Sequence, residues 1–140
     1  MDPTTARERF AAGRVARLAT ADAAGRPHVV AVCFAVEADV VYSAVDFKPK
    51  RTARLKRLAN VAENPAAALL VDHYDDERWE RLWWARADGA ARVLDRADPE
   101  AARALDLLAG RYAQYRARRP EGPVLAVEVA RWSGWSAAAG

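Results

Sequence analysis

Short apolar runs separated by polar and turn residues are the feature that most constrains the fold of this 140-residue chain. Each run has a length typical of a β-strand. The runs are residues 14–20, 28–36, 40–45, 66–74, 82–94 and 124–130. Short connections between the first three runs predict an antiparallel meander, and Gly89 inside the fifth run predicts a bulge or a bend. The second run is almost continuously apolar, which favours a strand buried on both faces.

Three helices are expected around these strands. Asp2-Pro3 and Asp98-Pro99 each combine a capping carboxylate with Pro at the first helical position. The remaining helix follows the third strand and ends at Asn64-Pro65. Closing a sheet of short antiparallel strands into a barrel removes its exposed edges. We therefore expect one mainly β (α+β) domain over residues 1–140, with six antiparallel strands and about three peripheral helices. Its N-terminal helix should lie within residues 1–13, and residues 133–140 should form a loose tail.

Composition limits the class of protein and its surroundings. The formal net charge is only +3, which suits a small anionic ligand better than nucleic acid, where a dominant basic stripe is expected. The single cysteine, Cys33, excludes a disulfide framework. The first residues lack the apolar core of a signal peptide, and no stretch approaches the ~18 apolar residues of a membrane helix. We therefore expect a cytoplasmic protein that binds neither nucleic acid nor a membrane.

The segment Asp46–Pro65 concentrates positive charge at the start of an amphipathic helix. Its basic residues are Lys48, Lys50, Arg51, Arg54, Lys56 and Arg57. Cations at a helix N-terminus are unfavourable by roughly 0.3–1 kcal/mol each, whereas an anion there would be held by free N–H groups and basic side chains together. The apolar face at helical spacing is Leu55, Leu58, Ala59 and Ala62. The segment is therefore either an anion site or a solvated basic face.

The sequence lacks residues for self-contained acid–base catalysis. It contains no nucleophile elbow, phosphate-binding loop, dinucleotide fingerprint or zinc-ligand spacing, and we assign neither a catalytic residue nor a metal site. We interpret His28 as structural, and Cys33 has no obvious base beside it. Trp83 and Trp84 are neighbours on one strand, so one should face the barrel interior and the other outward. A bound cofactor that performs the redox chemistry would explain this combination.

The order of these features resembles a known family. The carrying segments are LATADAAGRPHVVAVCFAVEADVVYSAVDFKPKR, the basic helix, NPAAALLV and LWWARADGAARVL. They are similar to the pyridoxamine 5′-phosphate oxidase-like, FMN-binding split β-barrel proteins. Within that group the chain looks most like the small coenzyme F420-dependent oxidoreductases, which use a deazaflavin. The resemblance covers roughly residues 10 to 132.

The resemblance implies a homodimer with the cofactor at the subunit interface, and it assigns roles to individual residues. Phosphate contacts would come from the backbone of Ser43, Ala44 and Val45 and from the side chains of Lys48, Lys50, Arg51 and Thr52. The ring system would be lined by Thr20, Val32, Cys33 and Phe34. Arg54 and Arg57 would reach the acidic tail of the deazaflavin. The partner chain would contribute Trp83, Trp84 and Arg86.

The expected activity is hydride transfer between the C5 position of coenzyme F420 and a small organic substrate. Two departures from the family pattern matter. The basic helix is about two turns longer before Asn64-Pro65, and residues matching the pyridoxamine phosphate site are missing, so that compound is not the expected substrate. An FMN-binding oxidoreductase of the same fold and a non-catalytic cofactor-binding protein remain alternatives. A nucleic-acid-binding role is a third, which the acidic stretch Asp72–Glu80 disfavours.

Overall fold

The sheet of this protein contains seven antiparallel strands among the residues that the structure describes. The computed structural model describes residues 1–45 and 51–138, without the side chains of residues 51–55. The strands are β1 (Ala16–Ala21), β2 (Pro27–Val32), β3 (Ala35–Glu37), β4 (Val40–Ala44), β5 (Ala66–His73), β6 (Trp83–Leu94) and β7 (Val124–Ser136). Their order in the sheet is β2-β1-β5-β6-β7-β4-β3.

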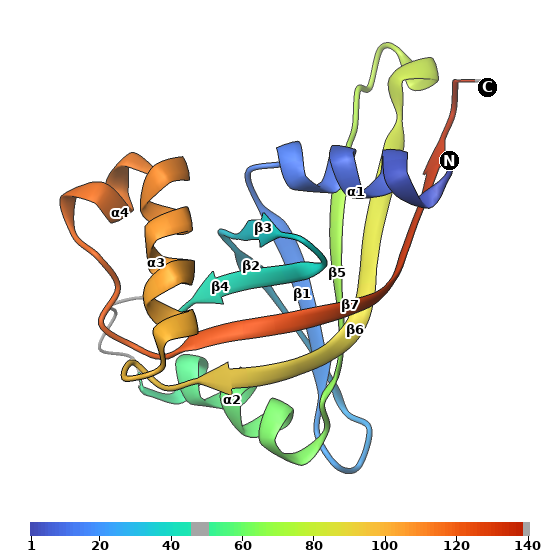
Figure 1. The fold of residues 1–140 in the computed structure, drawn as a ribbon. Helices are drawn as coiled ribbons and strands as arrows, with labels where there is room; N and C mark the ends of the chain where they lie inside the picture. Colours follow the sequence, from blue (N-terminus) through green and yellow to red (C-terminus); the bar gives the residue numbers. More distant parts are fainter. Residues whose placement is uncertain (46–50, 139–140) are drawn as a thin grey trace.

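This order forces the sheet to curl into a barrel that is split along one seam. β2 and β3 lie at opposite ends of the sheet, although only Cys33 and Phe34 separate them in the chain. Seven flat strands would place those ends about 29 Å apart, whereas the short link spans at most roughly 11 Å. The two ends must therefore meet in space, as Figure 1 shows. The expected split-barrel architecture is confirmed.

One detail of the predicted sheet was wrong. The run 28–36 is divided into β2 and β3, which makes seven strands in place of six. The first three runs do pair antiparallel in succession as predicted, β1 with β2 and β3 with β4. The division of the middle run, however, places these two hairpins at opposite ends of the sheet.

Two side chains at the end of α3 (Pro99–Arg111) explain why the run 28–36 is broken at Phe34. The Tyr112 hydroxyl accepts a hydrogen bond from the Phe34 N–H at 3.1 Å, and Arg111 Nη1 donates to the Phe34 carbonyl at 3.0 Å. Both main-chain groups of Phe34 thus find partners outside a strand ladder, as buried backbone groups require.

The helices cover the ends and one side of the barrel. They are α1 (Pro3–Ala12), α2 (Arg51–Glu63), α3 (Pro99–Arg111) and α4 (Ala113–Ala117), with a 3₁₀ turn, η1, at Trp79–Arg81. The Asp2 and Asp98 carboxylates cap α1 and α3 by accepting from the N–H groups of Thr5 and Glu100. Figure 1 shows α1 and α2 at opposite ends of the barrel and α3 with α4 beside it. No helix in the described ranges is long and apolar enough to cross a bilayer.

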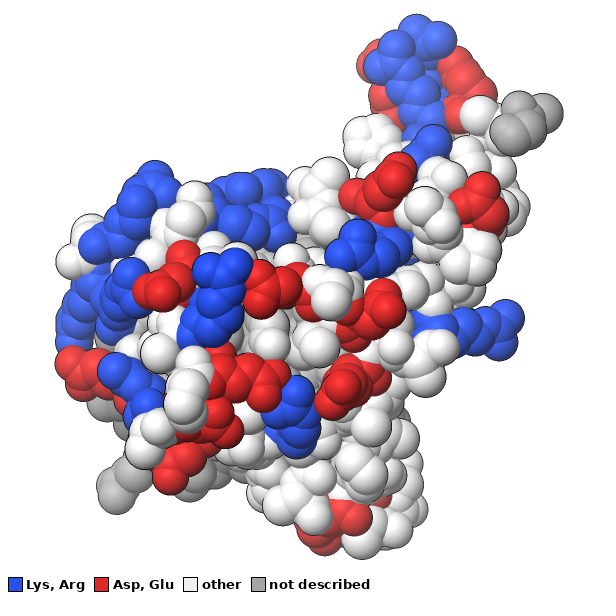
Figure 2. All heavy atoms as spheres, viewed as in Figure 1, with Lys and Arg blue, Asp and Glu red and all other residues white. Residues whose placement is uncertain are grey.

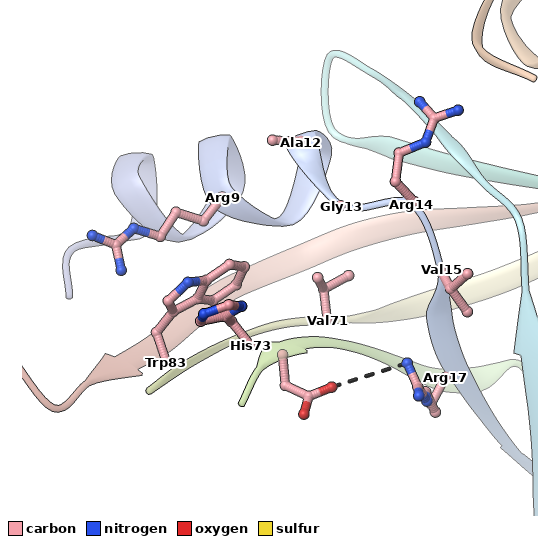
Figure 3. A pocket seen from close by; sticks show the side chains of 10 residues that line it. Arg9, Ala12, Gly13, Arg14, Val15, Arg17, Val71, His73 and Trp83 are labelled. Atoms are coloured by element: carbon pink, nitrogen blue, oxygen red, sulfur yellow. Dashed lines mark ion pairs between the residues drawn. The ribbon is translucent and has the colours of Figure 1, made fainter. Parts of the chain in front are cut away.

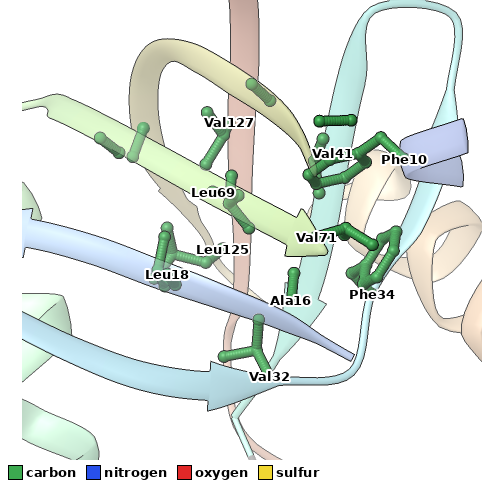
Figure 4. Packing of buried hydrophobic residues seen from close by; sticks show 14 of the residues in the cluster. Phe10, Ala16, Leu18, Val32, Phe34, Val41, Leu69, Val71, Leu125 and Val127 are labelled. Carbon is green, nitrogen blue, oxygen red and sulfur yellow. The ribbon is translucent and has the colours of Figure 1, made fainter. Parts of the chain in front are cut away.

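The barrel interior combines a few large side chains with many alanines. Phe10 from α1 enters one end, where its ring lies 4.9 Å from that of Phe34 (Figure 4). Leu18, Leu69 and Leu125 fill the centre, all nearly inaccessible to solvent. Alanines at the remaining inward positions leave room for these larger residues, since a small barrel is filled by its own side chains. A second apolar cluster lies between α3 and the sheet, around Leu105 and Leu108.

The buried face of α2 differs from the predicted stripe. Leu58 packs against the barrel core and Val61 is buried, but Ala59 and Ala62 are exposed. Asn60 is fully buried instead. The prediction counted alanines as core residues, whereas the helix turns a face that contains one buried amide toward β1.

The β5–β6 hairpin and the end of β7 extend beyond the barrel as an arm. The register between β6 and β7 shifts at Asp88/Gly89, so the ladder is irregular at the predicted glycine, but the extra residue, Ala130, lies in β7. Residues 133–136 were expected in a loose tail, but they belong to β7, where Ser133 pairs with Arg86 and Ser136 with Trp83. The tail prediction was therefore wrong for these residues, because β6 offers a ladder long enough to pair them (Figure 1).

Candidate functional site

A pocket beside the barrel seam brings together four of the residues expected to bind the cofactor. We call it the Cys33 pocket; its volume is about 180 Å³. Its lining residues are Val15, Ala31, Val32, Cys33, Ala44, Arg57 and Tyr115. Val32 ends β2, Cys33 starts the link to β3, Ala44 ends β4 and Arg57 lies on α2. The curl of the sheet places these separate chain segments around one cavity.

Other predicted ring and phosphate residues lie in the interior. Phe34 is fully buried, and its ring packs on Phe10 instead of lining the pocket. Ser43 and Val45 are also buried. The Val45 N–H donates to the Pro123 carbonyl at 3.1 Å, so it is not available to a phosphate in this structure.

Thr20 contacts α2 from inside the barrel. Its side chain is buried, and its hydroxyl accepts a hydrogen bond from Asn60 Nδ2 at 3.1 Å. Asn60 Oδ1 has no hydrogen-bond partner among the described residues. The pair therefore couples β1 to the helix that carries the basic residues, and Thr20 does not line the Cys33 pocket.

Part of the predicted phosphate site lies outside the described residues. This applies to Lys48 and Lys50, and to the side chains of Arg51, Thr52 and Arg54. The backbone of α2 begins at Arg51, within the basic segment, and Arg57 follows less than two turns later on the pocket wall.

The aromatic residues assigned to the partner chain lie on the arm, apart from the Cys33 pocket. Trp83 packs partly against the barrel core, whereas Trp84 lies on the opposite face under the Arg86 guanidinium, which is 5.5 Å from its ring centre. This confirms that the two tryptophans face opposite ways. Arg86 also pairs with Asp88 at 2.8 Å.

The outward side of the sheet over β1, β2, β5 and β6 carries apolar residues among four charged ones, Arg17, Asp72, Arg86 and Asp88. We call its apolar residues the outer sheet face; they are Ala19, Val29, Ala31, Ala68, Leu70 and Trp84. Ala19 pairs with both Val29 and Ala68, so these residues form a continuous row across three strands. Val29 is 60% exposed, and the expectation that this run is buried on both faces fails for the single chain. Ala31 also lines the Cys33 pocket, so the pocket opens at the edge of this face.

A buried aspartate fixes the turn next to α2. Asp22 Oδ1 accepts from the N–H groups of Ala24 and Arg26 at 3.0 and 2.9 Å. Hydrogen bonds from the Arg26 backbone, more than any other contact, hold the pKa of Asp22 below its usual value. Lys56 Nζ lies 4.0 Å from the same carboxylate, which links the β1–β2 hairpin to the basic helix.

Arginines near the pocket keep much of their positive charge unneutralised. Arg14 donates to the Arg111 carbonyl at 2.6 Å, and Arg116 to the Ala109 carbonyl at 2.9 Å. Neither of these two has a carboxylate within ion-pair distance in the described part of the chain. Figure 2 shows basic side chains gathered around the end of the molecule formed by α3 and α4.

Sequence reasoning missed three residues of the pocket. Tyr115 lies on α4, a short helix separated from α3 by the extended residue Tyr112, and the apolar pattern of α3 did not predict it. Val15 and Ala31 are small apolar strand residues that no local pattern distinguishes from others. Only the folded barrel identifies them as lining residues.

Solved structures share this fold over nearly the whole chain. A FAD-binding protein from Mesorhizobium loti aligns with a TM-score of 0.74 at 18% identity, covering 96% of this chain and 94% of that one. A heme storage protein from Vibrio cholerae gives 0.71 at 15% identity, covering 97% and 95%. A FAD-binding protein from Mycobacterium smegmatis gives 0.63 at 18% identity, covering 96% of each chain. At such identities these likenesses establish the fold alone.

Sequence comparison gives the family. None of the curated proteins matches the chain. The family model described as pyridoxamine 5′-phosphate oxidase, however, matches residues 3–136, from the first residue of α1 to the last residue of β7. Because that match covers nearly the entire chain and the split barrel is present, the protein belongs to the pyridoxamine 5′-phosphate oxidase family.

Proposed function

We propose that this protein is a homodimeric coenzyme F420-dependent oxidoreductase that transfers a hydride between the deazaflavin and a small organic substrate. The observation that carries the proposal is the Cys33 pocket, in which Val32, Cys33, Ala44 and Arg57 meet beside the start of the basic helix. Family membership and the two FAD-binding structures of the same fold support a flavin-type cofactor. The surplus of basic residues in the segment Asp46–Pro65 favours the long acidic tail of F420 over FMN.

The lining of the pocket fits part of a planar, anionic cofactor. Val32 and Ala44 offer an apolar wall, Tyr115 an aromatic ring and Arg57 a positive charge. A volume of about 180 Å³ is below the roughly 300–1,000 Å³ of pockets that bury a whole small ligand. A tricyclic ring bound here needs a second surface to exclude water, and a partner subunit would supply it.

The outer sheet face supports a dimer in which each subunit completes the other's site. An apolar row that includes an aliphatic residue as exposed as Val29 favours a covering partner. Because Ala31 belongs both to this face and to the pocket, a second copy docked there would cover the pocket mouth. The arm residues Trp84 and Arg86 would then be available to the neighbouring subunit's cofactor.

The residues that line the pocket indicate what the cofactor and the protein would each contribute to the reaction. The bound deazaflavin would supply the hydride chemistry. The described lining of the pocket contains neither a carboxylate nor a histidine, so the chain's own residues bind and orient the ring and exclude water. The substrate would gain a hydride from the cofactor and a proton from solvent, and the proton left by the oxidised cofactor would return to solvent.

Fluorescence titration with F420 tests the cofactor site. A charged hydrogen bond contributes about 1.5–3 kcal/mol, so Arg57→Gln and Lys50→Ala should each weaken binding roughly 10- to 100-fold. Arg131→Gln is the control, because it removes the same charge from an exposed residue of β7 that does not line the pocket. If the wild type and the three variants all bind F420 with equal affinity, Arg57 and Lys50 do not bind the cofactor.

FMN is the second candidate, because two proteins of the same fold bind another flavin, FAD. Native mass spectrometry after incubation with F420, FMN or hemin compares these cofactors and counts the subunits at once. A dimer carrying two F420 molecules is expected. Retention of FMN or hemin with no F420 would reject the deazaflavin. Tight F420 binding without oxidation of the reduced form by any acceptor would favour a non-catalytic binding protein.

A further inference from the structure

A second, larger pocket lies between α1 and the base of the arm. We call it the α1 pocket; its volume is about 360 Å³, within the usual range for small-molecule sites. Figure 3 shows it bounded by Arg9 on α1, His73 and Val71 on β5, Trp83 on β6 and Arg17 on β1. Val15 lines this pocket and the Cys33 pocket alike, so the two cavities adjoin across the start of β1.

Close packing of Gly13 against β5 shapes the apolar floor. A Cβ at Gly13 would lie 2.6 Å from Val71 Cγ1, so only glycine lets the end of α1 approach the strand this closely. One wall is aromatic: the rings of His73 and Trp83 stack with centres 6.3 Å apart and an angle of 22° between planes.

Positive charge exceeds negative charge around the pocket. Arg9, Arg14 and Arg17 line it with a single carboxylate, Asp72. Arg17 pairs with Asp72 at 4.0 Å, and the Arg14 guanidinium points away, toward Tyr112, where it is 4.6 Å from the ring centre (Figure 3). Arg9 has no carboxylate within ion-pair distance in the described part of the chain.

Arg9 is also held in place for recognition. Its guanidinium lies 5.6 Å from the centre of the Trp83 ring, and a guanidinium stacked on an aromatic ring keeps in-plane N–H groups for a carboxylate. The carbonyls at the C-terminal end of α1 oppose an anion. That effect is reduced because Arg111 donates a hydrogen bond to the Gly13 carbonyl.

We propose that the α1 pocket binds a small planar carboxylate, an aromatic or conjugated acid, with its ring along the His73–Trp83 wall and its carboxylate at Arg9. Binding of this acid is independent of the cofactor. Its role as the hydride acceptor rests on the proposed function: a conjugated double bond gains a hydride from the reduced deazaflavin and a proton from solvent. The charge of Arg9 beside the aromatic wall would therefore select an acid as the substrate.

Calorimetric titration of the full-length protein with 2-naphthoate tests the pocket. The control ligand is 2-naphthamide, which has the same ring without the charge. The acid should bind at least about tenfold more tightly, because only it forms a charged hydrogen bond with Arg9. Arg9→Gln should remove that preference. Arg78→Gln, which removes an exposed arginine outside the pocket, should keep it. Melting curves of both variants check that each is folded.

Three results would overturn the proposal: equal binding of acid and amide, an Arg9→Gln variant that retains the preference, or competition between F420 and 2-naphthoate. Competition would assign the α1 pocket to the cofactor itself. Loss of F420 binding in the separate fluorescence titration, with the preference for 2-naphthoate intact, would refute the proposed function and leave this site standing.

Discussion

Single polar residues hold together elements that lie far apart in the chain. Asn60 of α2 is fully buried and donates to Thr20 of β1, while its own Oδ1 has no partner among the described residues. Glu100 of α3 receives two hydrogen bonds from Arg92 of β6, at 2.8 and 2.7 Å, and one from the Tyr42 hydroxyl at 2.7 Å. These contacts fix how the helices sit on the barrel.

The Thr20–Asn60 contact predicts a stability effect separate from cofactor binding. Thr20→Val keeps the shape of the side chain but leaves Asn60 Nδ2 unpaired, which should lower the free energy of unfolding by about 1–3 kcal/mol in urea denaturation. Thr20→Ser keeps the hydroxyl and is the control. If Thr20→Val unfolds at the wild-type urea concentration but binds F420 more weakly, Thr20 contacts the cofactor and the structural role proposed here is wrong.

Glu100 predicts how stability depends on pH. Hydrogen bonds from Arg92, and then from Tyr42, lower the pKa of Glu100 from its usual 4.5 to about 2. The ionised form therefore favours the folded state. Its contribution is complete above pH 4.5 and is lost as the pH falls toward 2. Glu100→Gln should lower stability at neutral pH by about 1–3 kcal/mol and flatten this acid dependence.

Thermal unfolding between those pH values measures the effect of Glu100. The matched control is Glu121→Gln, which removes an exposed carboxylate from the loop before β7. An unchanged slope in Glu100→Gln, or an equal loss in the control, would contradict the assignment.

At the scale of elements, one glycine lets the two longest strands curve together. The register between β6 and β7 shifts at Asp88/Gly89, and Ala87 pairs with Trp132 on one side while Ala90 pairs with Glu128 on the other. The extra residue, Ala130, lies in β7 opposite Gly89. It should bend β7 where the strand passes from the barrel to the arm, because an extra residue bends a strand and increases its twist.

Gly89 and Gly110 should respond oppositely to alanine. A Cβ at Gly89 would lie 1.9 Å from the Glu128 carbonyl oxygen, so Gly89→Ala should destabilise the protein by about 1–3 kcal/mol or more. Nothing lies within 4 Å of a Cβ at Gly110, which is inside α3. Gly110→Ala should therefore stabilise it by roughly 0.5–1 kcal/mol. Melting temperatures that fall together in both variants would contradict this.

At the scale of the molecule, apolar residues lie both inside and outside the barrel. Inside is the core around Leu18, Leu69 and Leu125, and outside is the outer sheet face, with charged residues between its apolar ones. The barrel seam, the Cys33 pocket and this face meet at Ala31. Dimerisation through the face and completion of the cofactor site are therefore expected to occur together.

Val29→Glu tests this coupling. A carboxylate at this exposed position of the outer sheet face should convert a dimer into a folded monomer, because two like charges would meet without solvent. F420 binding should weaken with it. Val93→Glu, at an exposed position of β6 outside that face, is the control. Light scattering after size-exclusion chromatography gives the mass, and a dimeric Val29→Glu protein would exclude this face as the interface.

Local sequence alone determined most elements of this protein. The starts of α1 and α3, the irregular ladder at Gly89 and the position of the basic helix depend on capping, proline geometry and spacing within a few residues. Tertiary structure decided which residues from distant segments come into contact. Tyr112 and Arg111 broke the apolar run at Phe34, Asn60 became buried, and Tyr115 joined Cys33 and Arg57 at one pocket. Those outcomes depend on strand pairing and packing between distant segments, which no local pattern records.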